Sequence, residues 1–143
     1  MKFSVVSILL IIDLLFSPNS NAQPVKPDNN YQKLLSQGHA LYQSKSYQPA
    51  LSAYQASFAL EPLDSTLHNM AICHYKLKQW PQALTKFEEL NNNQQSVALI
   101  EYYIAVIHKK MGNTEQAIDG FYDLMQYSDD DSVVLMAMKQ LKI

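Results

Sequence analysis

The sequence predicts an all-α protein, an α-solenoid of three helical hairpins closed by a C-terminal capping helix. The main observation is a recurring triplet: a small residue, an alanine twelve positions later, and an aromatic residue four positions after that. The three triplets are Gly38, Ala50 and Tyr54; Ala71, Ala83 and Phe87; and Ala105, Ala117 and Phe121. They are offset by 33 and then 34 residues, a period typical of stacked helical hairpins. No alternating strand pattern competes with this interpretation.

Turn and capping residues divide the first half of the chain at the points that this period requires. The segment 44–46 separates the first two predicted helices, and Pro62 follows the second helix, which it cannot extend. Asp64 and Ser65 offer caps for the third helix, and Pro81 fits the first turn of the fourth. These breaks predict helices at about 31–44, 47–60, 64–78 and 80–91.

The second half of the chain is divided in the same way. The asparagine run 91–93 breaks the chain before the fifth helix, and Gly112 can end that helix in the left-handed conformation. The acidic run 129–131 can cap the last helix, because negative charge is favourable at the positive end of a helix. Helices are therefore predicted at about 95–111, 114–127 and 131–142.

The residues around each triplet resemble the signature of the tetratricopeptide repeat family. The first helices carry the matching sets Leu34, Gly38 and Leu41; Leu67, Ala71 and His74; and Glu101, Ala105 and His108. The resemblance implies one domain over 31–143, with repeats at about 31–62, 64–94 and 98–129 and a capping helix at about 131–142. It also implies a protein that binds other proteins and is not an enzyme.

The residue types of the triplet have a packing role. Small residues let the two helices of a hairpin approach closely, and the aromatic ring fills the wedge between one hairpin and the next. A single hairpin cannot bury its apolar face alone, so three copies are expected to form one continuous core. In the last predicted helix, Val133, Val134, Ala137, Met138 and Leu141 form the stripe expected to cover the third repeat.

The family resemblance also implies a binding surface, because the first helix of each hairpin lines a concave groove in this family. The facing positions lie three residues before the small residue, one after it, and four and five after it. On this chain they are Leu35, His39, Tyr42, Gln43, His68, Ile72, Tyr75, Lys76, Tyr102, Val106, Lys109 and Lys110. This lining would suit a peptide with apolar side chains and a carboxylate or acidic residue, which the aromatic rings and the lysines would contact.

The first 22 residues differ in composition from the rest of the chain. Lys2 precedes an apolar run, and small residues at 20–22 form a cleavage site, which is the layout of a secretory signal peptide. The apolar run is about a dozen residues, too short for a stable membrane span. We therefore expect a signal peptide at 1–22, a flexible lead-in at 23–30, and a secreted or periplasmic protein. Cleavage and retention as a loose anchor both remain open.

Composition and motifs argue against several functional classes. The formal net charge of −2 over 143 residues does not favour nucleic-acid binding. Cys73 is the single cysteine, so no internal disulfide forms, and it is expected to be a buried core residue. The four histidines have no metal-ligand spacing, and no nucleophile or phosphate-binding motif is present. No catalytic residue, metal or cofactor is predicted.

The predicted function is a non-catalytic adaptor of the cell envelope that binds a protein or peptide partner in its groove. One alternative is a homo-oligomeric scaffold, such as a homodimer, joined through the last helix. Three apolar residues of that segment lie on the opposite side from its packing stripe and could form the contact, namely Leu135, Met136 and Ile143. A second alternative is an export chaperone like those of type III secretion. Such chaperones act in the cytoplasm, so the fate of the leader separates this alternative from the adaptor.

Overall fold

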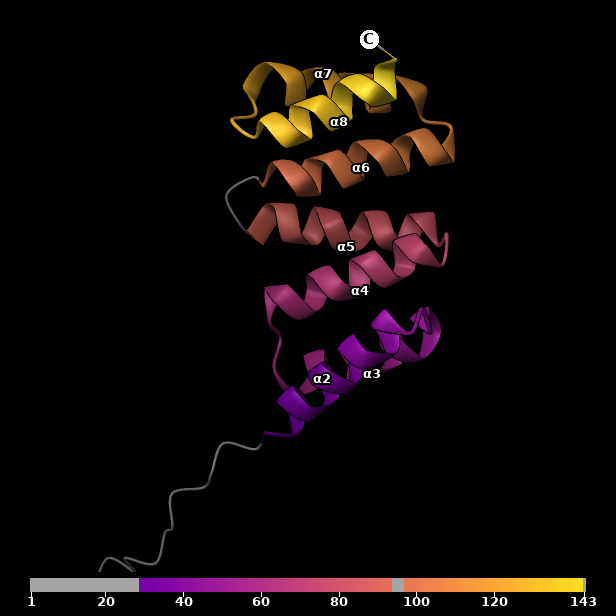
Figure 1. The fold of residues 1–143 in the computed structure, drawn as a ribbon, viewed down its shortest axis with the longest axis vertical. Helices are drawn as coiled ribbons and strands as arrows, with labels where there is room; N and C mark the ends of the chain where they lie inside the picture. The colour runs from indigo at the N-terminus through magenta and orange to yellow at the C-terminus, as the bar shows by residue number, and fades with distance from the viewer. Residues whose placement is uncertain (1–28, 94–96, 143) are drawn as a thin grey trace, which may run out of the picture.

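The computed structural model describes residues 29–93 and 97–142, and these residues form seven α-helices (Figure 1). The described part of the chain contains no strand. The helices are α2 (Asn30–Gln43), α3 (Tyr47–Leu60), α4 (Asp64–Lys76), α5 (Trp80–Asn93), α6 (Ala98–Met111), α7 (Thr114–Tyr127) and α8 (Asp131–Leu141). Each boundary lies within three residues of its prediction. No helix among these residues has the length and apolar character needed to cross a membrane.

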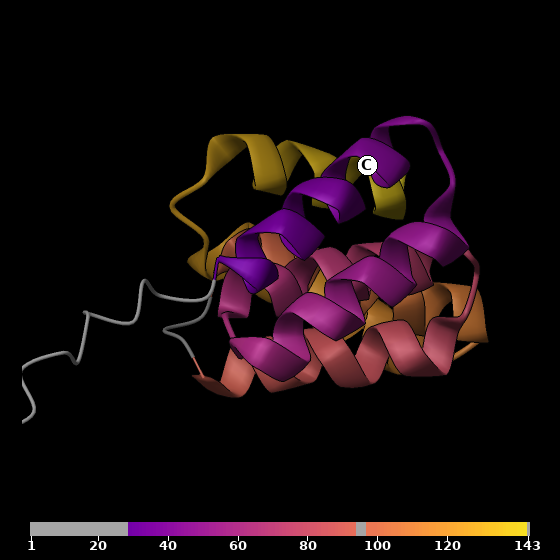
Figure 2. The ribbon, with the colours of Figure 1, turned by 90° about the horizontal axis from the view of Figure 1, so that it is seen from below.

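Consecutive helices pair into three hairpins that stack on one another. Helices α2 and α3, α4 and α5, and α6 and α7 pack as antiparallel pairs, and each pair contacts the next. Figure 1 shows the pairs as successive layers with α8 at the C-terminal end of the stack, and Figure 2 shows the same stack from below. The predicted α-solenoid of three hairpins and a capping helix is therefore confirmed.

The residues predicted to pack between the helices are buried. The three second-helix alanines, Ala50, Ala83 and Ala117, are at most 2 % exposed. The ring residues Tyr54, Phe87 and Phe121 are at most 1 % exposed. Because close-packed interiors tolerate little change in volume, these positions require small residues and rings respectively. Cys73 is also buried, as predicted.

One type of turn joins the two helices of every hairpin. In each turn, the backbone N–H of one residue donates to the carbonyl oxygen five residues earlier. The N···O distance is 2.9 Å in all three bonds, which run from Ser46 to Leu41, from Gln79 to His74, and from Asn113 to His108. The residue before each of these donors is left-handed, with φ of 61° at Lys45, 60° at Lys78 and 83° at Gly112. This is the expected helix-ending motif. The prediction for Gly112 is confirmed, whereas the two lysines were not expected in this conformation.

The helix starts show one confirmation and one correction. Asp130 caps α8, because its side chain accepts hydrogen bonds from the backbone N–H groups of Ser132 and Val133. Asp64, predicted as a cap of α4, lies in the first helical turn, and Leu63 occupies the cap position. The predicted signal peptide and most of the predicted lead-in lie outside the described residues.

Candidate functional site

A hollow of about 320 Å³ lies among the helices of the first two hairpins and α6. We call it the groove hollow. Its lining comes mainly from α2 and α4, the first helices of their hairpins, with one ring from α3 and one from α6. The lining residues are His39, Tyr42, Gln43, Tyr54, His68, Asn69, Ile72, Lys76 and Tyr103.

Histidines and tyrosines form the walls of the groove hollow. His39 meets the ring of Tyr54 edge-on at a centroid distance of 5.6 Å, and its Nε2 lies 3.2 Å from Nδ2 of Asn69. His68 meets Phe87 edge-on at 6.0 Å. Burial lowers the pKa of His68 from its usual 6.5, because removal from water disfavours the charged imidazole. The ring of His68 is therefore a neutral, half-buried surface at pH 7.

The tyrosine hydroxyls of the groove hollow stay protonated. Burial, with smaller contributions from neighbouring Cys73 and Tyr42, raises the pKa of Tyr54 to about 12. Burial also raises the pKa of Tyr42 and of Tyr103. The lining contains no carboxylate, and Lys76 is its one residue with a fixed charge. The groove hollow therefore offers rings, neutral donors and a single cation.

Six of the twelve predicted groove residues line the groove hollow. They are His39, Tyr42, Gln43, His68, Ile72 and Lys76, and all six belong to the first two repeats. Leu35 is partly buried against the core cluster of the first hairpin. Lys110 is exposed on α6 outside this hollow. The structure brings together the predicted groove positions of repeats one and two.

Three of the four predicted lining residues of the third repeat contact α8. Val106 is 4 % exposed and belongs to the core cluster that contains Val133 of α8, so its predicted position on an open groove is corrected. Nζ of Lys109 donates to the main-chain oxygen of Gln140 at 2.8 Å. The hydroxyl of Tyr102 accepts a hydrogen bond from Nε2 of Gln140 at 3.0 Å. The capping helix therefore occupies the C-terminal third of the predicted groove.

Tyr75 is held by other aromatic rings and does not line the groove hollow. Its ring meets Trp80 at 5.5 Å and Tyr103 at 5.3 Å, edge-on in both cases. Tyr103 in turn stacks flat on Phe87 at 5.0 Å. This chain of rings fixes the α6 side of the groove hollow, because each ring is constrained by its neighbour.

Sequence reasoning missed three lining residues, Asn69, Tyr103 and Tyr54. Asn69 and Tyr103 share a register, since each lies two positions before the small residue of its repeat. That shared register, with a polar or aromatic residue in both copies, was the available signal. Tyr54 was predicted only to pack between hairpins, yet it also lines the groove hollow.

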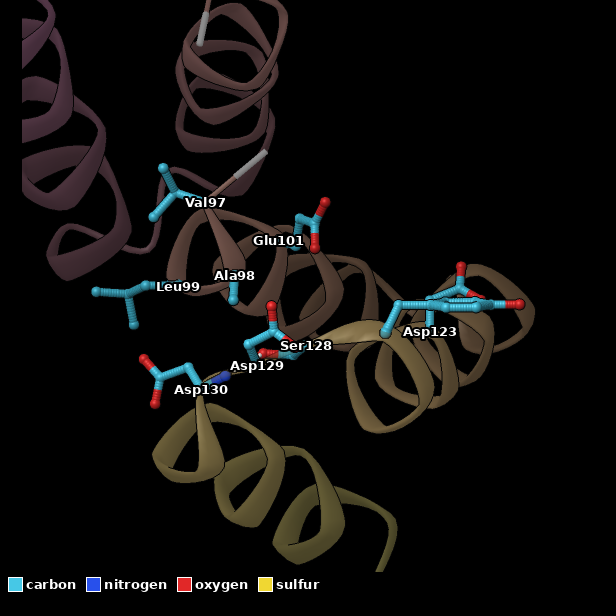
Figure 3. Close-up of a pocket in the computed structure, with 9 residues that line it drawn as sticks. Val97, Ala98, Leu99, Glu101, Asp123, Ser128, Asp129 and Asp130 are labelled. Carbon is cyan, nitrogen blue, oxygen red and sulfur yellow. Dashed lines mark hydrogen bonds between the residues drawn. The ribbon is translucent and has the colours of Figure 1, made fainter. Parts of the chain in front are cut away.

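A second hollow, of about 680 Å³, has the opposite charge (Figure 3). We call it the acidic hollow. Its side chains come from the start of α6, the end of α7 and the loop that leads into α8. They include the carboxylates of Glu101, Asp123, Asp129 and Asp130. A peptide carboxylate therefore has a favourable electrostatic environment in the groove hollow and an unfavourable one here.

The histidines outside the groove hollow brace turns. Nδ1 of His74 lies 2.7 Å from Oε1 of Gln79, and Nδ1 of His108 lies 3.2 Å from Nδ2 of Asn113. Both pairs span the same turn of successive hairpins. Among the described residues, no group of three or more histidine, cysteine, aspartate or glutamate side chains could hold a metal ion.

Of the three residues predicted for an oligomer contact, Leu135 is 68 % exposed. Met136 is partly buried and packs against the core cluster shared by α6, α7 and α8. Ile143 lies outside the described residues.

Comparison with known families agrees with this architecture. The tetratricopeptide repeat model matches residues 65–95 and 101–130, which are the second and third hairpins. No curated protein gives a significant sequence match to the chain.

Solved structures share the fold at low sequence identity. The tetratricopeptide repeat domain of Arabidopsis OM64 superposes with a TM-score of 0.69 at 14 % identity, over 81 % of this chain and 97 % of that one. PcrH from Pseudomonas aeruginosa gives a TM-score of 0.68 at 18 % identity, over 80 % of this chain and 91 % of PcrH. PcrH in complex with the chaperone binding region of PopB gives a TM-score of 0.65 at 18 % identity. That match covers 77 % of this chain and 93 % of the PcrH chain.

The seven helices of the described residues form a helical-hairpin solenoid, and the groove hollow lies on it. The chain has the fold of a tetratricopeptide repeat protein, and its second and third hairpins carry the repeat of that family. Proteins of this class are generally non-catalytic interaction modules.

Proposed function

We propose that this protein is a non-catalytic adaptor of the cell envelope that holds a peptide or helical segment of a partner protein in its groove. The groove hollow carries this proposal. It combines rigid aromatic walls with a small number of polar groups, which is the composition of surfaces that bind peptides. The complex of PcrH with a region of PopB supports such a role for the fold.

The chemistry of the groove hollow favours a particular kind of segment. Tyr42, Ile72 and Tyr103 offer apolar contact area, and the neutral ring of His68 adds to it. Lys76 provides the fixed positive charge, and no carboxylate opposes it within the lining. The segment that fits is apolar with one acidic group, an aspartate, a glutamate or a terminal carboxylate.

Site-specific crosslinking tests this function. A photoreactive residue replaces Gln43, which is exposed and lines the groove hollow. The matched control carries the same residue at Gln82, which is exposed on α5 and lies outside the lining. We expect one partner to be captured from position 43, and the capture to be lost in Ile72→Glu, which places a carboxylate inside the hollow. Equal capture from both positions would contradict a groove-bound partner.

The envelope location is part of this proposal and rests on the leader alone. A mature N-terminus at Gln23, determined by mass spectrometry of protein from its native host, supports export and cleavage. An intact Met1 in the soluble fraction contradicts export. That result favours the second alternative, an export chaperone that acts in the cytoplasm.

A homo-oligomeric scaffold is the other candidate, and the exposure of Leu135 favours it. A leucine with two thirds of its surface in water can anchor a contact between copies. Light scattering across the micromolar range separates this candidate from the monomeric adaptor. A dimer that dissociates in Leu135→Gln supports the scaffold, and a monomer at every concentration excludes it.

A further inference from the structure

One edge of the solenoid carries exposed lysines from every hairpin. This edge is formed by the three turns that join the helices of each hairpin, together with the C-terminal end of α8, on the right of Figure 1. We call it the lysine edge. Its lysines are all exposed, and they are Lys45, Lys76, Lys78, Lys109, Lys110 and Lys142.

These lysines are not used for ion pairs within the described part of the chain. The ion pair found there joins Lys86 to Glu89 within α5, away from this edge. Lys109 bonds to the neutral Gln140. Glu115, in the first turn of α7, brings one carboxylate to the same end of the molecule. The lysine edge therefore keeps a strong positive excess that the fold does not neutralise.

The backbone gives independent evidence that lysine at these positions is not selected for stability. Among the described residues, Lys45, Lys78 and Lys142 are the non-glycine residues with positive φ, between 60° and 61°. A side chain in the left-handed region is strained, and glycine avoids this strain, as Gly112 does at the third turn. Residues held in strained backbone conformations cluster at functional sites. Here the three strained residues all carry their charge on one edge.

The opposite edge has the opposite charge. The connection between α3 and α4, the start of α6 and the loop before α8 lie on the left of Figure 1. The acidic residues in and beside them include Glu61, Asp64, Glu101, Asp129, Asp130 and Asp131. Although the net charge is only −2, the two edges form a large electric dipole across the solenoid. A negatively charged surface would attract one edge and repel the other.

We propose that the lysine edge docks the protein onto an anionic phospholipid surface. The six lysines lie in the last turns of α4 and α6, in the turns between paired helices and at the end of α8. This spread over successive hairpins suits an extended surface more than a single bound anion. Tyr47 and Trp80 begin α3 and α5 at this edge, and both are half-buried. Lysine, tyrosine and tryptophan together are typical of residues at a membrane interface. Docked in this way, the protein keeps its acidic edge away from the lipid.

The variant Lys45→Gly/Lys78→Gly tests this proposal, because it separates charge from folding. It removes two positive charges and also relieves two strained backbones, so it should bind lipid more weakly while unfolding at a higher temperature. Binding is measured by sedimentation with vesicles of phosphatidylcholine and phosphatidylglycerol, and with vesicles of phosphatidylcholine alone. Each lysine removed is expected to weaken binding about fivefold at low salt, so the double variant should lose about 25-fold.

Lys33→Ala/Lys86→Ala is the matched control, because it removes the same charge from outside the lysine edge. It should keep most of the affinity for anionic vesicles. No preference for anionic over neutral vesicles overturns the proposal, and so does an equal loss of affinity in both double variants. Equally tight, lysine-dependent binding to polyglutamate also overturns it, because the edge would then serve an acidic protein. Self-association that the glycine variant abolishes without lipid would instead assign the edge to a second copy.

Discussion

The ring of Tyr54 lies directly against the backbone of Gly38. A Cβ atom added at residue 38 would lie 2.6 Å from both Cδ1 and Cε1 of Tyr54 and 3.1 Å from its Cζ. Both residues are buried in the first hairpin, and Tyr54 is 1 % exposed. The glycine is thus required by packing against the aromatic residue of its own repeat. The equivalent positions of the next two repeats carry Ala71 and Ala105.

Gly38→Ala should destabilise the protein despite the better helix propensity of alanine. Overpacking a buried site costs about 1–3 kcal/mol, and replacing a helical glycine returns about 1 kcal/mol. A net loss of about 1 kcal/mol in the free energy of unfolding is expected from these terms. Urea unfolding followed by circular dichroism measures it.

The same change in a Tyr54→Leu background provides the control. With the ring removed, the added methyl has space, and Gly38→Ala should become neutral or stabilising. A double-mutant cycle then gives a coupling between residues 38 and 54. An equal loss in both backgrounds would show that the ring is not the cause.

Lys78→Gly should stabilise the protein by about 1 kcal/mol, because glycine is not strained at a φ of 60°. The reciprocal change, Gly112→Ala, should destabilise by a similar amount. A Cβ at residue 112 would meet no atom within 4 Å, so the loss would come from its φ of 83° alone. Thermal unfolding of both variants measures these two changes in stability. Shifts of the same sign would contradict this account of the turns.

The helices could be predicted because local signals mark both their packing faces and their ends. Pro62 and Gly112 end helices by their own geometry, and the triplets set the period. The end of α4 was predicted at residue 78 but lies at Lys76. The reason is that Lys78 adopts the left-handed conformation, which lysine has no intrinsic tendency to take.

The groove was predictable only where it depends on one helix at a time. Counting from the small residue selects His39, His68 and Lys76, and all three line the groove hollow. The same count placed Val106 on an open surface, because it could not show that α8 packs there. That contact joins elements that are distant along the chain, and its geometry is not encoded in any single-helix pattern.

Cys73 should resist thiol reagents in the folded protein. Its side chain is fully buried, and burial raises the pKa of the thiol to about 11. Since the thiolate is the reactive form, roughly one thiol in a thousand would be ionised at pH 8. Labelling with a chromogenic disulfide should therefore be slow in buffer and fast in urea. Ser52→Cys, at an exposed position of α3, supplies the fast control, and equal native rates at both sites would contradict the buried placement.

The stability of the protein should fall as His68 becomes protonated. Burial lowers the pKa of His68 in the folded state below 6.5, whereas in the unfolded chain it stays near 6.5. Between these two values the unfolded state binds more protons, so the free energy of unfolding decreases as the pH falls. The loss should begin as the pH drops through about 6.5, and it should level off below the folded-state pKa.

Urea unfolding at a series of pH values between about 7.5 and 5 measures this effect, in a range above the titration of most carboxylates. The glutamine in His68→Gln cannot be protonated. As the pH falls, the free energy of unfolding of the wild type should therefore decrease relative to that of this variant. His74 and His108 brace turns outside the hollow and are unchanged in both proteins, so the difference isolates the substitution at residue 68. A difference that stays constant with pH would show that His68 is as well solvated in the folded groove as in the unfolded chain.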